Sequence, residues 1–226
     1  MSEVTPPEEN SEPSDTSEPV IAPATVLAIG AHTDDIEFGC GGTLLALAKQ
    51  GVSMALMILT DGANGGDPKV RRAEQVRAGV RLGEPTLVFS GFPDGGLTDS
   101  ALPVVETLVE AIQPALVFVN SPDDTHQDHM QVPLLLEAAC RKRSTSILYY
   151  ETISTRQFDP TVFADISAVM EKKIGLLQCH ESQMSRDLVG RAKSLASYWG
   201  WRARVRRAEA FEPVRFLFQP NKGMLP

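Results

Sequence analysis

Two short polar segments hold most of the residues that are able to do metal-dependent chemistry. The first covers residues 31–35 and reads Ala-His-Thr-Asp-Asp, and the second covers residues 121–129 and reads Ser-Pro-Asp-Asp-Thr-His-Gln-Asp-His. Three of the four histidines of the chain lie in these segments. Two histidines and one carboxylate form a common set of ligands in catalytic zinc sites, which keep an open position for water. The sequence therefore predicts a zinc centre if the fold brings the two segments together.

The two segments also contain the groups that hydrolysis needs beside the metal ligands. Zinc lowers the pKa of a water ligand to about 7 and polarises a carbonyl group. A spare carboxylate can take the proton of that water, and a spare histidine can stabilise an oxyanion or protonate a leaving amine. A further carboxylate can orient this histidine through its other ring nitrogen. The spacing leaves open whether His126 or His129 binds the metal.

Short apolar runs alternate with helical patterns along the chain. Strands are expected at 25–31, 53–59, 86–89, 115–120 and 146–150, with an edge strand at 207–219. Helices are expected at 42–50, 68–82, 102–112, 132–142, 166–180 and 188–204. Strands that are apolar throughout and alternate with helices predict an α/β, Rossmann-like, doubly wound fold, with a mostly parallel sheet covered by helices on both faces. In the strand order 3-2-1-4-5, the first and fourth strands are neighbours, and the two polar segments meet at the switch point where such folds bind ligands.

The stretch from His32 to Leu44, HTDDIEFGCGGTL, resembles the opening signature of the LmbE-like, or PIG-L, deacetylase family, which reads AHPDD(I/A)E-x-GCGGTL. The stretch from Pro122 to His129 is similar to the PxDxHxDH motif of that family. Shorter segments also match, at residues 60–62, 71–74, 92–95, 180–183 and 208–211. The resemblance extends over residues 25–212 and implies a zinc-dependent N-deacetylase.

The resemblance also implies a role for each of seven residues. The implied zinc ligands are His32, Asp35 and His129, and the implied general base is Asp34. His126 would act on the oxyanion or the leaving amine, with Asp128 as its orienting carboxylate. Arg71 would contact the substrate or help at the oxyanion. Two positions depart from the family pattern. Thr33 stands in place of the usual proline, and Ser121 stands where many members have histidine. We expect both changes to affect the substrate pocket or the stiffness of the loop and to leave the metal chemistry intact.

Charge and composition limit the partners of the protein. The 226 residues carry a net charge of −8, and six negative charges without any positive one lie in residues 1–23, which leaves −2 for the remainder. This Pro-, Ser- and Glu-rich leader is expected to be disordered, and residues 24–226 to form a single domain. A nearly neutral body predicts no nucleic-acid partner. The sequence has no apolar stretch long enough to predict a membrane span, and no signal peptide is recognised. Three cysteines without CxxC spacing suggest a cytoplasmic protein.

The predicted function is therefore that of a zinc-dependent amidohydrolase that removes an N-acyl group, with acetyl expected, from an aminosugar, a glycoside or a similar small polar metabolite. A homo-oligomer is expected because families of this kind often assemble. Two alternatives are a non-catalytic Rossmann-like module that binds a metabolite, and a metal-dependent esterase. The carboxylate of Asp34 favours an enzyme over the binding module, since a module that only binds has no need of a general base.

Overall fold

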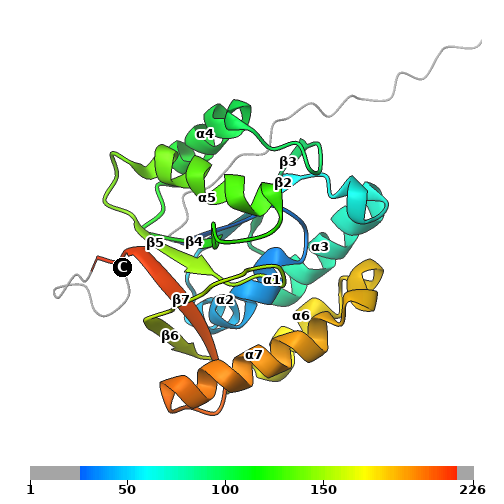
Figure 1. Ribbon diagram of the computed structural model, residues 1–226, viewed down its shortest axis with the longest axis vertical. Helices are drawn as coiled ribbons and strands as arrows, with labels where there is room; N and C mark the ends of the chain where they lie inside the picture. The colour runs from blue at the N-terminus through cyan, green and yellow to red at the C-terminus, as the bar shows by residue number, and fades with distance from the viewer. Residues whose placement is uncertain (1–25, 218–226) are drawn as a thin grey trace, which may run out of the picture.

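Seven strands form one mixed sheet in a computed structural model that describes residues 26–217 (Figure 1). The order across the sheet is β3-β2-β1-β4-β5-β7-β6. The strands are β1 Val26–Gly30, β2 Met54–Thr60, β3 Thr86–Phe92, β4 Leu116–Asn120, β5 Ser146–Tyr150, β6 Val162–Asp165 and β7 Ala208–Arg215. The first five are parallel, so the expected doubly wound order 3-2-1-4-5 is confirmed. The expected leader, residues 1–23, lies outside the described residues.

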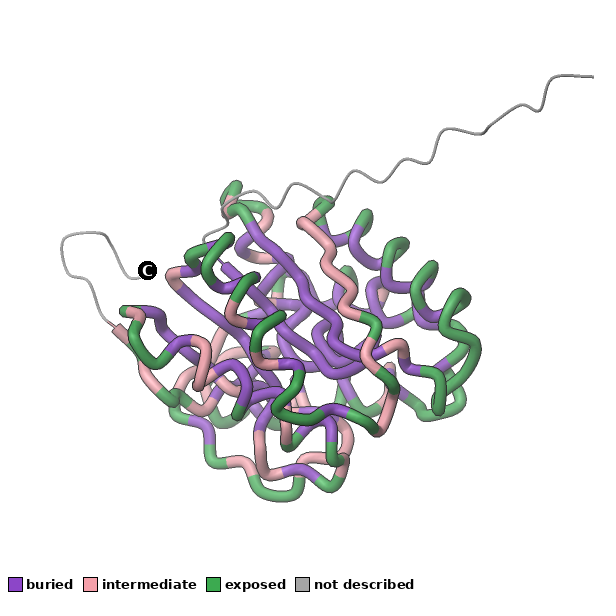
Figure 2. The backbone as a smooth tube through the Cα atoms, turned by 90° about the horizontal axis from the view of Figure 1, so that it is seen from above, coloured by how far each residue is buried: buried purple, intermediate pink, exposed green. Residues whose placement is uncertain are grey.

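Helices cover both faces of the sheet (Figure 1). The α-helices are α1 Asp35–Gly39, α2 Gly41–Ala48, α3 Pro68–Leu82, α4 Leu102–Ile112, α5 Gln127–Cys140, α6 Met170–Leu177 and α7 Leu188–Ala203. Helices α4 and α5 pack on one face, against strand residues such as Leu27 and Ile29, and the other helices pack on the opposite face, against residues such as Ala28 and Phe118. The central strands are buried throughout, as Figure 2 shows. Burial on both faces explains why these strands have no polar alternation in the sequence.

The register of β1 and β4 brings the two polar segments to one point. Ala28 pairs with Phe118 and Ile29 with Val119 in parallel. Both strands therefore have their carboxyl ends on the same side of the sheet, and each polar segment begins immediately after its strand. Among the residues described, no helix is long and apolar enough to cross a membrane.

Three of the differences between the structure and the sequence-based expectation affect the site or the order of the sheet. A short helix, α1, begins inside the first polar segment, where too few residues precede Gly39 for a helical period to be recognised. Helix α5 begins five residues before the expected start, because His126 caps it. The expected edge strand is β7, but it lies between β5 and β6, and the four-residue β6 forms the edge. The pattern of a short strand does not reveal its pairing partner, which only long-range contacts decide.

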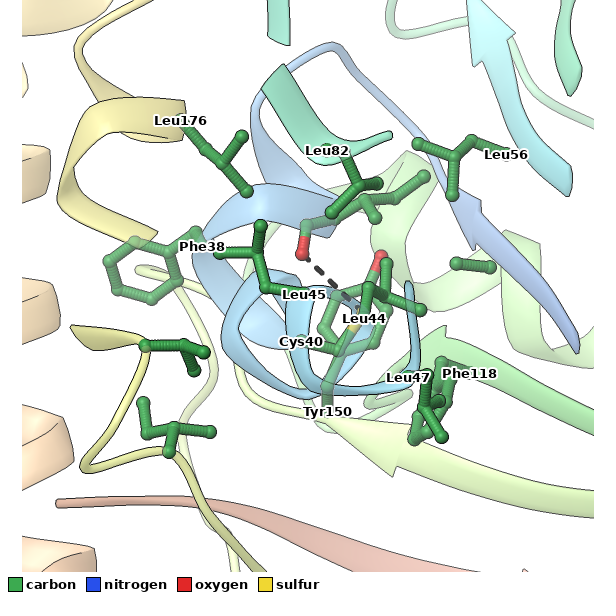
Figure 3. Close-up of a cluster of buried hydrophobic side chains, with 14 of the residues drawn as sticks. Phe38, Cys40, Leu44, Leu45, Leu47, Leu56, Leu82, Phe118, Tyr150 and Leu176 are labelled. Atoms are coloured by element: carbon green, nitrogen blue, oxygen red, sulfur yellow. Dashed lines mark hydrogen bonds between the residues drawn. The ribbon is translucent and has the colours of Figure 1, made fainter. Parts of the chain in front are cut away.

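The glycine-rich part of the first motif serves close packing. A Cβ atom on Gly39 would lie 2.0 Å from Cδ2 of Tyr150, so only glycine permits this approach. Tyr150 in turn donates a hydrogen bond to the carbonyl oxygen of Ile29, at 2.7 Å. Cys40 lies fully buried in the same apolar cluster, and its thiol donates to the carbonyl oxygen of Ile36 (Figure 3). Cys40 is thus a packed core residue rather than a group of the polar site.

Candidate active site

Three potential metal ligands face one another at the carboxyl ends of β1 and β4. Nδ1 of His32 lies 3.1 Å from Nε2 of His129 and 3.5 Å from Oδ2 of Asp35. The same Oδ2 atom lies 3.2 Å from Nε2 of His129. In a tetrahedral zinc site with bonds of about 2.0–2.1 Å, the donors are separated by about 3.3–3.4 Å. The three side chains therefore have the chemical types and the spacing that suit a zinc ion.

The outward-facing nitrogens of the two histidines contact carboxylates. Nε2 of His32 lies 3.0 Å from Oδ1 of Asp94 and 3.3 Å from Oδ2 of Asp128. Nδ1 of His129 lies 3.1 Å from Oδ2 of Asp124. Histidines that bind metals usually donate their second ring N–H to such a group, which fixes the tautomer and orients the ring. These contacts thus leave Nδ1 of His32 and Nε2 of His129 free to face a cation.

The surrounding carboxylates give the site a strongly negative field. Burial disfavours the charged imidazolium, but hydrogen bonds with Asp128, Asp35 and Asp94 raise the pKa of His32 to about 11. Burial likewise opposes the charged form of His129, yet the charge of Asp35 and the hydrogen bond with Asp124 raise its pKa to about 9. A field that holds a proton on both rings also favours a divalent cation between them.

A second group of donors lies on the opposite side of the His32 ring. One donor atom each from His32, Asp94, His126 and Asp128 lies within 4.8 Å of the others, and the same holds for the three histidines His32, His126 and His129. A cation bound at Nε2 of His32 would replace the proton through which this nitrogen contacts Asp94 and Asp128, and the two carboxylates would no longer orient the ring. The tighter spacing on the Nδ1 side, together with the intact outer carboxylates, favours the set of His32, Asp35 and His129.

Asp34 and Asp35 are adjacent but point in different directions. Asp34 has a φ of 90°, in the left-handed region, which turns its carboxylate away from that of Asp35. Its Oδ1 lies 3.6 Å from Nη2 of Arg71, and its buried Oδ2 has no hydrogen-bond partner. Burial and then the neighbouring charge of Asp35 raise the pKa of Asp34 to about 6, although His180 and Arg71 act in the opposite direction. A carboxylate with an unpartnered oxygen and a raised pKa is suited to accept a proton.

The expected pairing of Asp128 with His126 is not seen. The carboxylate of Asp128 accepts hydrogen bonds from the backbone N–H groups of Gly95 (2.7 Å) and Leu97 (3.1 Å), and it faces His32. The group that reaches His126 is the backbone N–H of Asp128, which donates to Nδ1 at 3.3 Å. This correction follows from the N-cap geometry of α5, which turns the His126 ring back over the first helical turn. Because Nδ1 accepts this bond, the proton of the neutral His126 ring lies on Nε2.

Arg71 lies at the rim of the site but is held by the protein backbone. It is fully buried and donates to the carbonyl oxygens of Gly62 (2.8 Å) and Thr33 (3.0 Å). Arg71 therefore fixes the loop that carries the ligands, in addition to lining the cavity beside them. Ser121, by contrast, is buried, accepts a hydrogen bond from the backbone N–H of Asp123 and does not line this cavity. The effect of Ser121 on substrate choice stays a prediction.

Sequence reasoning missed two carboxylates of the site and assigned no role to the fourth histidine, His180. Asp94 lies in one of the matched segments and Asp124 in the second motif, so both were within reach, but only the structure pairs them with histidines. His180 is fully buried, lies 3.4 Å from Oε2 of Glu37 and does not line the cavity. It therefore belongs to the support behind Asp34 and not to the surface that a substrate meets.

Comparisons with known proteins agree with this geometry. A family model described as PIG-L, GlcNAc-PI de-N-acetylase, matches residues 27–140. The uncharacterized deacetylase YaiS of Escherichia coli is 33% identical over 70% of this chain and 90% of its own. Diacetylchitobiose deacetylase of Thermococcus kodakarensis is 28% identical over 85% of this chain and 84% of its own.

A solved structure extends the similarity to the fold. The conserved protein TT1542 of Thermus thermophilus has a TM-score of 0.77 and is 28% identical, with 87% of this chain and 98% of that chain covered. The match to the family model includes β4, all of β1 except Val26, and every expected ligand and catalytic residue. The chain therefore belongs to the PIG-L, or LmbE-like, family, and it is a metal-dependent N-deacetylase.

Proposed function

We propose that the protein is a zinc-dependent hydrolase that removes an acetyl group from the amine of an aminosugar or a related glycoside. The observation that carries this proposal is the triangle of donors formed by His32, Asp35 and His129. Beside it lies the carboxylate of Asp34, whose Oδ2 accepts no hydrogen bond, although Nη1 of Arg186 lies 3.9 Å away. A site that only binds a metal or a metabolite has no use for this carboxylate. An esterase would use the same groups, so the experiment must compare amide and ester substrates.

The residues divide the work of amide hydrolysis among them. His32, Asp35 and His129 would hold the zinc ion, which when bound would supply Lewis-acid chemistry for the water and the acyl carbonyl. Asp34 accepts the proton of the attacking water on its free Oδ2. Nε2–H of His126 stabilises the developing negative charge on the carbonyl oxygen. As the C–N bond breaks, the proton held by Asp34 passes to the leaving amine, and the acyl group leaves as the carboxylate.

The neighbouring cavity suits a polar substrate. It has a volume of about 340 Å³, and the residues that line it beyond the metal ligands are mostly polar: Asn64, Gly65, Arg71, Asp94, His126, Ser182, Gln183, Ser185 and Arg186. Several amide, hydroxyl and guanidinium groups match the many hydroxyls of a sugar. Diacetylchitobiose, named for one relative, is an N-acetylated sugar of this kind. A cytoplasmic location and a homo-oligomeric state remain predictions.

The experiment is a zinc-depletion and rescue assay. The purified protein is treated with a chelator, dialysed and supplied with stoichiometric zinc, and acetate release is measured from N-acetylglucosamine conjugates and from matched O-acetyl sugars. We expect about one zinc per chain, loss of hydrolysis when it is removed and recovery when it is returned. The rate enhancement over the uncatalysed reaction should be larger for the amide than for the ester. Full activity after complete removal of the metal would refute the proposal.

A further inference from the structure

Three cavities lie in a row through the site. The open cavity of about 340 Å³ shares Asp35, His129 and Arg186 with a much smaller cavity of about 10 Å³. The small cavity shares Phe38, Thr152 and Ile153 with a third cavity of about 380 Å³. The small cavity, which we call the inner pocket, therefore lies between the expected metal position and the third, outer cavity.

The inner pocket is lined differently from the open cavity. Asp34, Asp35 and His129 lie at its metal-facing end, and Phe38, Ile153 and Leu188 provide its apolar side chains. The remaining lining residues are polar: Thr152, Ser154 and Arg186. Phe38 and Leu188 are buried members of the main apolar cluster, and Figure 3 shows Phe38 within it. A volume of about 10 Å³ holds roughly one water-sized group. The inner pocket thus offers an apolar patch formed by three side chains and room for a group no larger than a methyl.

The chemistry of an amide fixes which part of a substrate faces each cavity. In the reaction of the proposed function, the acyl carbon must lie beside Asp34 and the ligands, with its amine on one side and its acyl substituent on the other. His126, which acts on the oxyanion or the amine, lines the open cavity and not the inner pocket. A sugar does not fit into a pocket of about 10 Å³, so the amine and its sugar occupy the open cavity of about 340 Å³, and the acyl substituent points into the inner pocket.

On the basis of the proposed function, we propose that the inner pocket is the acyl subsite and that it restricts the enzyme to acetyl groups. Ile153 is the residue that closes this pocket. Ile153 lines both the inner pocket and the outer cavity, so its side chain is part of the wall between them. Phe38 is the other large side chain of this wall, but it is buried in the core and its removal would disturb folding. Ile153 is only partly buried, which makes it the residue to truncate.

The test measures acyl selectivity in the metal-loaded protein. The ratio of kcat/KM for N-acetyl to N-butanoyl derivatives of the same amine is determined for the wild type, Ile153→Ala and Leu195→Ala. Leu195 lines the outer cavity but not the inner pocket, so Leu195→Ala is a matched truncation that leaves the wall intact. Binding of acetate and of butanoate is measured by calorimetry for each protein, which tests the pocket without turnover.

We expect the wild type and Leu195→Ala to favour acetyl by at least about 10-fold, since one surplus methylene group changes discrimination by about 10–200-fold. Ile153→Ala should lower this preference by about tenfold or more, in hydrolysis and in carboxylate binding alike. Equal hydrolysis of both acyl groups by the wild type, or an unchanged preference in Ile153→Ala, would overturn the inference while the deacetylase function stands. Failure to hydrolyse any N-acyl amine would instead refute the proposed function, and carboxylate binding would still decide the role of Ile153.

Discussion

The adjacent carboxylates Asp34 and Asp35 have the same chemistry but different proposed roles, so Asp34→Asn and Asp35→Ala should have different consequences. Asp35 lies 3.2 Å from Nε2 of His129 and 3.5 Å from Nδ1 of His32, within the ligand triangle. Asp34 instead lies 3.6 Å from Arg71. Asp34→Asn keeps all three ligands, so zinc content should remain at the wild-type level. Asp35→Ala removes a ligand, and zinc and activity should be lost together.

The size of the activity loss in Asp34→Asn follows from the role of a general base. Loss of such a group lowers kcat by about 10²–10⁴, which corresponds to about 3–5 kcal/mol of transition-state stabilisation. Asparagine tolerates the left-handed φ of 90° at this position, so the backbone should be maintained. Burial raises the pKa of Asp34, which means that folding disfavours its ionised form, and a neutral amide should leave the stability at neutral pH unchanged or higher.

The assay pairs zinc content, from elemental analysis, with kcat for N-acetyl hydrolysis in each purified variant. Thermal unfolding serves as the control for folding. Wild-type activity in a zinc-loaded Asp34→Asn protein would refute the role of Asp34 as base. If Asp34→Asn lost zinc and Asp35→Ala retained it, the two roles would be reversed.

Three further substitutions test the support around the site. Asp94→Asn removes a carboxylate from Nε2 of His32, and competition with a chelator should show zinc affinity reduced by about 10–100-fold; unchanged affinity would contradict the orienting role. Glu209→Gln leaves the buried ammonium of Lys173 without its counter-charge and should reduce the free energy of unfolding by about 3–5 kcal/mol in denaturant titrations, against less than about 1 kcal/mol if the pair is dispensable. Thr33→Pro removes a buried hydroxyl that has no partner and stiffens the loop, so calorimetry should show a gain in stability of about 0.4–1 kcal/mol; a loss would mean that the backbone at Thr33 does not accept proline.

The regular part of the fold could be predicted because local patterns carry it. Apolar runs without polar alternation indicated the buried parallel strands, and the helices at 68–82 and 102–112 have the expected bounds. The edge of the sheet could not be predicted in this way. Four residues of β6 carry too little periodicity, and the pairing of β7 with β5 depends on contacts between residues about sixty positions apart.

The sequence by itself determined the types of the reacting groups and the point at which they meet, since two polar motifs follow strands whose order the α/β pattern implies. Only the tertiary structure decided which atoms face one another. It turned Asp34 away from Asp35 through a left-handed backbone, paired Asp128 with His32 instead of His126, and brought Asp94 to the outer nitrogen of His32. Spacing along a chain limits which residues can meet, but the direction of each side chain is set by backbone dihedral angles and by packing between segments distant in sequence.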